Sequence, residues 1–215
     1  MLSLFKKKKK SIPERTIDDL KRITKILFID DLTFNLVDSL KEKDGWQNVQ
    51  KIKDVDSLSQ TEVREAHIIF VDVQGVGKKL GFEDEGLGLI SALRNSYPAK
   101  KIIMYSAESK GRIDGLHPSG NIVDYRLRKT ATRYEFESTI ERFAKESFCL
   151  DNCIMHIKDV FLRELGITKN DEEIRRIVEI LYNKGTYNDP QKIASAFNLS
   201  NIGSIASIIQ LLLMS

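Results

Sequence analysis

Short apolar runs alternate with amphipathic stretches along the first two thirds of this sequence, and this alternation constrains the fold more than any other feature. Five runs have the length and composition of buried strands, and they occupy residues 25–29, 48–53, 67–71, 101–105 and 122–127. Stretches with apolar residues at helical spacing separate or follow them, at residues 33–43, 57–65, 85–96 and 132–148. Strands that alternate with helices predict a parallel sheet covered by helices on both faces.

This pattern predicts an α/β fold of the flavodoxin-like type. Five strand–helix units within roughly 125 residues suit a five-stranded parallel sheet in the order 2-1-3-4-5. Ligands of such sheets bind beside the carboxyl ends of the strands. The residues that follow each strand are therefore the first place to look for chemistry.

After Leu150 the strand pattern stops, and a small all-α domain is expected. Amphipathic stretches cover 152–165 and 171–182, a third helix opens at Asp189-Pro190, and a fourth runs from Ser200 to Met214. Ahead of the sheet, Ser11 and Pro13 suggest the capped start of a short helix. The predicted parts are a basic tail with a leading helix at 1–23, the α/β domain at 24–148, and a helical module at 149–215.

The composition indicates a folded, water-soluble chain. Hydrophobic residues make up 41% and charged residues 30%, and the net charge of +3 is too small for a protein built to hold a polyanion. No apolar window reaches the ~18 residues of a membrane span. Cys149 and Cys153 fit neither a redox pair nor a zinc site, which favours a reducing, cytoplasmic location. Lys6 to Lys10 form a solvated tail or, alternatively, a weak contact for an anionic surface.

Polar residues stand at the end of four of the predicted strands. Asp30 and Asp31 follow the first strand, Asp72 the third, Ser106 the fourth and Lys129 the fifth. Three carboxylates at one sheet edge need a cation, and hard oxygen ligands suit Mg²⁺. A carboxylate can act as a nucleophile toward phosphorus, while a lysine and a hydroxyl stabilise phosphoryl oxygens. The set has what phosphoryl transfer to an aspartate requires.

The same strand ends resemble those of two-component response-regulator receivers. Ile26 to Asp31 resembles the first strand and acidic pair of that family, and Ile68 to Asp72, with Gly77 beyond it, resembles the strand and loop of the phosphoacceptor. Ile102 to Ala107 resembles the strand that ends in the switch Ser/Thr, and Lys129 matches the family's lysine. The resemblance covers about residues 24 to 148.

This resemblance implies a role for each residue at the predicted site. Asp72 would accept the phosphoryl group, Ser106 would report it through its hydroxyl, and Lys129 would pair with it. The implied Mg²⁺ ligands are Asp31 directly, Asp30 mainly through water, Asp72, and the carbonyl of Gln74. The phosphate would come from a histidine kinase or phosphotransfer protein. Such a protein catalyses its own phosphorylation and dephosphorylation but is not an enzyme with an external product.

The chain also departs from the family pattern. Thr130 stands where proline usually follows the lysine, and the loop at 78–86 is longer than usual and acidic. The aromatic switch position holds Arg126. Arg128, next to Lys129, leaves the register of the fifth strand open by one residue.

Three other functional classes share some features with this sequence. Residues 190–214 suit a helix-turn-helix of a DNA-binding regulator, but Asn198 to Ser215 contains no Lys or Arg, which favours a protein-interaction module. A degenerate receiver that serves as a scaffold is a further alternative. A dehalogenase-like phosphatase would need Asp-x-Asp after the first strand, and Leu32 and Thr33 break that motif.

The last predicted helix is apolar around most of its circumference. Such a helix must be buried on several sides, and a bundle of roughly 65 residues has little interior to spare. We therefore expect it to contact a partner or a second subunit, in a way that phosphorylation of Asp72 alters.

Overall fold

The chain folds into two compact units. The computed structural model describes residues 12, 14–32, 35–107, 122–200 and 203–213 of the 215-residue chain. The larger unit, Arg15–Ser147, contains the sheet, and the smaller unit contains the helices from Phe148 onward.

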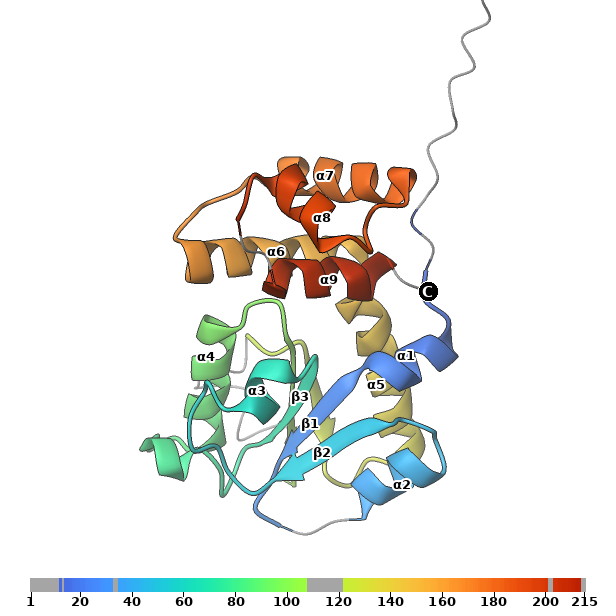
Figure 1. Cartoon of the computed structure of the whole chain (residues 1–215). Helices are drawn as coiled ribbons and strands as arrows, with labels where there is room; N and C mark the ends of the chain where they lie inside the picture. The colour runs from blue at the N-terminus through green and yellow to red at the C-terminus, as the bar shows by residue number, and fades with distance from the viewer. Residues whose placement is uncertain (1–11, 13, 33–34, 108–121, 201–202, 214–215) are drawn as a thin grey trace, which may run out of the picture. The chain divides into compact units, whose positions relative to one another are not determined.

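A five-stranded parallel sheet forms the centre of the larger unit (Figure 1). Its strands are β1 Lys25–Ile29, β2 Asn48–Ile52, β3 Ile68–Asp72, β4 Lys101–Ser106 and β5 Tyr125–Arg128. They lie in the order β2-β1-β3-β4-β5, and every neighbouring pair is parallel. The predicted flavodoxin-like sheet, with its order 2-1-3-4-5, is confirmed.

Helices cover both faces of this sheet, as strands buried on both faces require. The helices of the larger unit are α1 Ile17–Ile23, α2 Leu36–Glu42, α3 Thr61–Glu65, α4 Gly86–Ser96 and α5 Arg133–Ser147, with a 3-10 turn, η1, at Lys78–Leu80. α2 and α5 contact each other on one face, while α3 and α4 pack on the other (Figure 1). Alternate residues of β1, β3 and β4 therefore point into two separate apolar layers.

The ends of several elements differ from the prediction. β5 begins three residues later than expected, because Asp124 is held ahead of it by Arg94 and by the N–H of Ile102. α3 begins at Thr61 instead of residue 57, because the side chain of Gln60 accepts backbone N–H groups there and turns the chain.

The leading helix α1 starts at Ile17, after the N-cap Thr16, whose side chain accepts the N–H of Asp19. The predicted start at Ser11 and Pro13 lies outside the described residues. α1 buries Leu20 and contacts α5, so it belongs to the larger unit.

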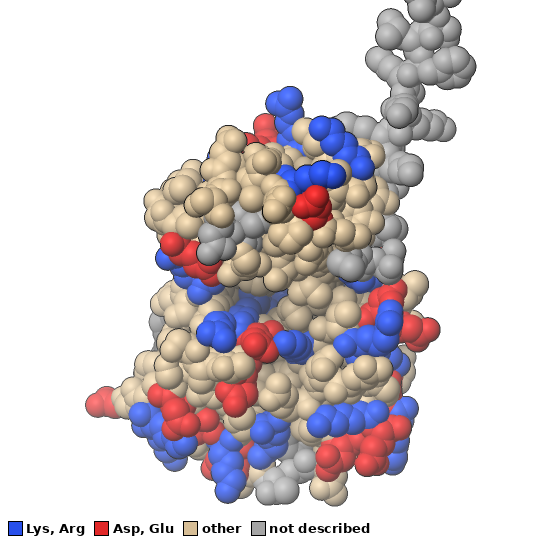
Figure 2. Space-filling model, viewed as in Figure 1, with Lys and Arg blue, Asp and Glu red and all other residues tan. Residues whose placement is uncertain are grey.

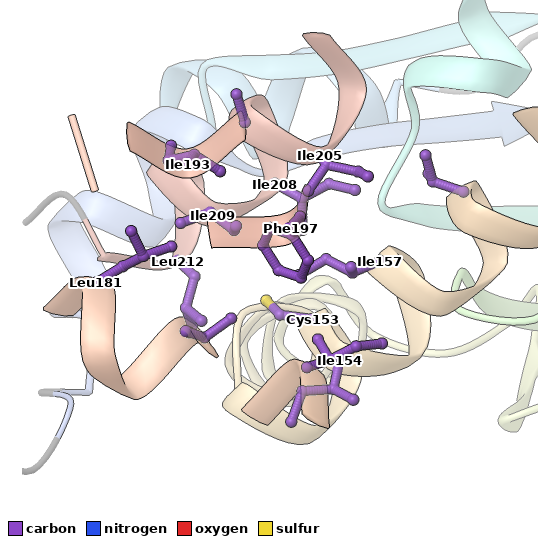
Figure 3. Close-up of a cluster of buried hydrophobic side chains, with 14 of the residues drawn as sticks. Cys153, Ile154, Ile157, Leu181, Ile193, Phe197, Ile205, Ile208, Ile209 and Leu212 are labelled. Carbon is purple, nitrogen blue, oxygen red and sulfur yellow. The ribbon is translucent and has the colours of Figure 1, made fainter. Parts of the chain in front are cut away.

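The smaller unit is helical, as predicted, in its described residues. Its helices are α6 Leu150–Leu165, α7 Asp171–Lys184, α8 Pro190–Phe197 and α9 Gly203–Leu213. Asp189 caps α8 by accepting the N–H groups of Gln191 and Lys192, with Pro190 in the first turn. All four helices contribute to one apolar cluster, part of which Figure 3 shows.

Most of the apolar surface of α9 lies within this cluster. Its buried residues are Ile205, Ala206, Ile208, Ile209, Leu212 and Leu213. Among the described residues of α9, Leu211 alone is an exposed large apolar side chain. The bundle therefore has more interior than its length suggested, although a partner contact through this helix stays a prediction. No helix in the described part of the chain combines the length and the hydropathy of a membrane span.

The packing of α4 against the end of β3 gives a first prediction. A Cβ at Gly86 would lie 1.9 Å from the carbonyl oxygen of Asp72, so Gly86→Ala must push the helix away from the strand. We expect a loss of about 1–3 kcal/mol in the free energy of unfolding, measured by denaturant titration. Gly203→Ala is the control, because a Cβ there meets no atom within 4 Å. Equal stabilities of the two variants would contradict this account of the packing.

Candidate functional site

Three aspartates meet at the carboxyl edge of the sheet. Asp30 and Asp31 follow β1, and Asp72 is the last residue of β3, the strand that pairs with β1. A carboxylate oxygen from each of the three lies within 4.8 Å of the others. Asp30 and Asp72 are buried, whereas Asp31 is exposed. The site thus combines two desolvated carboxylates with one that faces solvent.

Lys129 is the cation that the structure places among these carboxylates. Its Nζ lies 2.5 Å from Oδ2 of Asp72 and 3.0 Å from Oδ2 of Asp30. The backbone N–H of Lys129 donates to the carbonyl of Ser106 at 2.8 Å, which ties the lysine to the end of β4. Arg128 is exposed. The one-residue ambiguity in the sequence is therefore resolved: Lys129 faces the aspartates.

Asp30 is held by contacts that the sequence analysis did not identify. Its Oδ2 accepts the hydroxyl of Tyr105 at 2.6 Å, in addition to its ion pair with Lys129. Its Oδ1 accepts the N–H of Leu32 at 2.8 Å. Tyr105 precedes Ser106 in β4, so its side chain lies on the opposite face of the sheet from the serine. The alternation predicts only which face of the sheet Tyr105 occupies, and not that its hydroxyl reaches Asp30.

Burial and the ion pair shift the pKa values of this group. Burial raises the pKa of Asp72, although the ammonium of Lys129 partly opposes the shift. Burial disfavours the charged form of Lys129, but the two carboxylates outweigh that effect and raise its pKa. Burial, followed by the hydrogen bond to Asp30, raises the pKa of Tyr105 far above its ordinary value. The phenol therefore remains a hydrogen-bond donor.

The two remaining predicted residues lie beside this group. Ser106 is the buried last residue of β4, next to the position where Tyr105 pairs with Asp72. The backbone N–H of Gln74 lies 3.4 Å from Oδ1 of Asp72, a long hydrogen bond. A carbonyl ligand from Gln74 and a switch role for the Ser106 hydroxyl stay predictions.

The β3–α4 loop is fixed by two further carboxylates that sequence reasoning missed. Glu85 accepts the N–H of Gly75 through Oε2 at 2.5 Å and pairs with Lys78 through Oε1 at 3.1 Å. Asp54 accepts the N–H groups of Gly77 and Lys79, at 2.5 and 3.1 Å. These hydrogen bonds therefore anchor the loop at three of its backbone N–H groups.

The donor set fits a hard dication such as Mg²⁺. Three carboxylates can supply oxygen ligands, and within the described residues Lys129 is the one ammonium that pairs with them. Gly75 has φ +82°, and a Cβ there would lie 2.4 Å from the Asp31 carboxylate. A side chain at this position would collide with Asp31, so the glycine allows the carboxylate to keep its place in the cluster.

Comparisons with solved structures find similarity to receiver domains. The receiver domain of NtrX from Brucella abortus is 21% identical, and the match covers 56% of this chain and 98% of that one, with a TM-score of 0.45. A CheY-like receiver protein from Methanospirillum hungatei JF-1 is 17% identical. That match covers 58% of this chain and 96% of the other, also with a TM-score of 0.45. The chain is similar to response-regulator receivers.

A further similar structure is the response regulator TrrA from Thermotoga maritima in complex with Mg²⁺ and BeF. It is 20% identical, and the match covers 56% of this chain and 98% of that one, with a TM-score of 0.44. No family model matches the chain, and no curated protein does. The fold assignment rests on the strand pairings within the chain itself.

The buried ion pair gives a second prediction. Lys129→Met leaves Asp30 and Asp72 buried without their cation, so at neutral pH and without divalent ions we expect a loss of about 3 kcal/mol in unfolding free energy. Burial, no longer opposed by the lysine, and the nearby Asp30 carboxylate then hold the folded-state pKa of Asp72 above its unfolded value, so stability falls as pH rises through the folded pKa. The deficit should shrink in acid. Arg128→Met, at an exposed neighbour, is the control for chemical denaturation at several pH values.

A deficit that is the same at every pH, or equal in both variants, would argue that Lys129 does not neutralise the carboxylates.

Proposed function

We propose that the larger unit is a receiver domain that accepts a phosphoryl group on Asp72 with the help of Mg²⁺. The observation that carries this proposal is the convergence of the Asp30, Asp31 and Asp72 carboxylates with Lys129 at the carboxyl edge of a parallel sheet. This edge is where α/β sheets of this order bind ligands. The proposed role is in signalling, with a histidine kinase or phosphotransfer protein as the donor.

The chemistry follows from the positions of the side chains. A carboxylate oxygen of Asp72 attacks the phosphorus of a phosphohistidine or a small acyl phosphate. A P–O bond to aspartate forms while the bond to the leaving group breaks, and the leaving group takes the electron pair. Hydrolysis of the acyl phosphate by water returns the carboxylate. The turnover is thus the protein's own phosphorylation cycle.

Lys129 and Ser106 act on the transferred group. The Lys129 ammonium already lies 2.5 Å from Asp72, so a short movement carries it onto the new phosphoryl oxygens. The Ser106 hydroxyl, at the end of the next strand, is proposed to donate to another of these oxygens and so to report the modification.

The proposed metal ligands differ in how free they are. Asp31 is exposed, and Oδ1 of Asp72 accepts a hydrogen bond of 3.4 Å from the Gln74 N–H, which is long enough for an ion to replace it. These two carboxylates are therefore proposed as direct ligands, together with the Gln74 carbonyl. Both oxygens of Asp30 already accept hydrogen bonds within the protein, which suits contact with the ion through water. Bound Mg²⁺ supplies positive charge for the phosphoryl oxygens.

The smaller unit is proposed as a protein-interaction or self-association module of a cytoplasmic protein. The helix-turn-helix alternative would place α9 in the DNA groove, but α9 contains no Lys or Arg, and most of its apolar residues are in the core. Figure 2 shows few charged side chains on the visible face of this unit, whereas acidic and basic side chains intermingle on the larger unit. These observations favour a protein partner over nucleic acid.

The third prediction tests the phosphoacceptor. Incubation of the full chain with acetyl phosphate and Mg²⁺ should add the mass of one phosphoryl group, detected by intact-mass spectrometry. Asp72→Ala should abolish this gain, and chelation of Mg²⁺ should suppress it. Asp56→Asn, which removes a highly exposed carboxylate, is the control and should be labelled normally. Labelling of Asp72→Ala at the wild-type level would refute the assignment, and an unlabelled wild type would favour a degenerate receiver.

The fourth prediction tests the metal ligands. Asp31→Ala should weaken Mg²⁺ binding by about tenfold or more, because it removes one of few direct carboxylate ligands. Isothermal titration calorimetry with Mg²⁺ alone measures this without any phosphodonor. Glu83→Ala, an exposed acid of the neighbouring loop, should bind as the wild type does. If both variants lose affinity equally, general surface charge and not a ligand set attracts the ion.

A further inference from the structure

The side chain of Tyr105 is fixed by the aromatic rings around it. Its ring meets those of Phe28, Phe70 and Phe136 nearly edge-on, with centroids 6.1, 6.2 and 6.3 Å away. The residue is 1% exposed. Because packing fixes the ring, the position of its hydroxyl at the site is also fixed.

That hydroxyl competes with Lys129 for one oxygen. Oδ2 of Asp30 accepts the Tyr105 hydroxyl at 2.6 Å and the Lys129 ammonium at 3.0 Å. The same ammonium lies closer to Asp72, at 2.5 Å. The neutral Tyr105 hydroxyl therefore compensates part of the charge of Asp30. The ion pair of Lys129 with Asp30 is also longer than its ion pair with Asp72.

We propose that Tyr105 is a positioning residue, whose hydroxyl shares Oδ2 of Asp30 so that Lys129 stays directed at Asp72 and free to follow the phosphoryl group. This inference rests on the proposed function. Asp30 thereby acts as a tether for the lysine, and Tyr105 sets the strength of that tether.

The space beside Lys129 is consistent with such a movement. A cavity of about 220 Å³ adjoins the tether. Its lining residues are Asp30, Leu32, Leu36, Tyr105, Lys129, Ala131 and Phe136. Asp30 is the one carboxylate among these described lining residues, so they offer the ammonium no other carboxylate that would draw it away from the site.

Loss of the hydroxyl should redirect the lysine. In Tyr105→Phe the ring contacts remain, but Oδ2 of the buried Asp30 has lost its neutral donor. A buried carboxylate demands compensation, so the ammonium moves toward Asp30 and away from Asp72. We expect the maximal rate of phosphorylation by acetyl phosphate to fall by about tenfold, while the Mg²⁺ concentration for half-maximal rate changes by less than about twofold.

The experiment uses the full chain and has two independent readouts. Intact-mass time courses over a series of Mg²⁺ concentrations separate the maximal rate from the metal requirement. NMR of the Lys129 ammonium group, without metal or phosphodonor, reports its surroundings directly, and its signal should shift in Tyr105→Phe. Tyr97→Phe is the matched control: it removes a buried hydroxyl that donates to the Leu58 carbonyl at 2.7 Å, and it should change neither readout.

The outcomes distinguish failure of the positioning role of Tyr105 from failure of the proposed phosphorylation of Asp72. A wild-type rate in Tyr105→Phe, an unshifted Lys129 signal, or an equal effect of Tyr97→Phe would overturn the positioning role. A change confined to the Mg²⁺ requirement would also overturn it, because the hydroxyl would then act through the metal. If the wild type itself takes no phosphoryl group, the proposed function fails, and the Lys129 signal still decides whether Tyr105 positions the lysine.

Discussion

The structure of the site depends on one electrostatic constraint: three carboxylates crowd the edge of a sheet, and the ammonium of Lys129 lies among them. Two of the carboxylates, Asp30 and Asp72, are buried, so they cannot rely on water for compensation. Lys129 must therefore come from a strand end in register with theirs, and the parallel sheet provides that register. A residual negative charge remains, which is the property that a dication requires of such a site.

The fold and most of this site could be predicted from sequence because both depend on strong local signals. Apolar runs such as 68–71 are buried on both faces, so their position is readable without knowledge of their neighbours. The acidic residues directly follow those runs. β5 is different, because none of its four residues is fully buried and its pattern carries little periodic signal. The choice between Arg128 and Lys129 therefore needed the structure.

The contacts that prediction missed join residues far apart in sequence through side chains that have ordinary alternatives. Tyr105 in a buried strand is equally compatible with a plain core aromatic residue, and only the geometry shows that its hydroxyl reaches Asp30, 75 residues away. Asp54 and Glu85 lie in loops, where an acidic residue is usually solvated. Nothing in their local sequence indicates that they accept backbone N–H groups of the β3–α4 loop.

The hydrogen bonds of Asp54 and Glu85 fix the β3–α4 loop beside the carboxylate cluster. The β3–α4 connection would have conformational freedom beside Asp72 if it were held only at its ends. Asp54 and Glu85 remove that freedom by holding Gly77, Lys79 and Gly75 through their backbone N–H groups. Gly75 is thereby kept against Asp31, where only a residue without a Cβ fits. The carboxylate cluster can thus keep its shape beside this loop, because the anchors determine the position of Gly75.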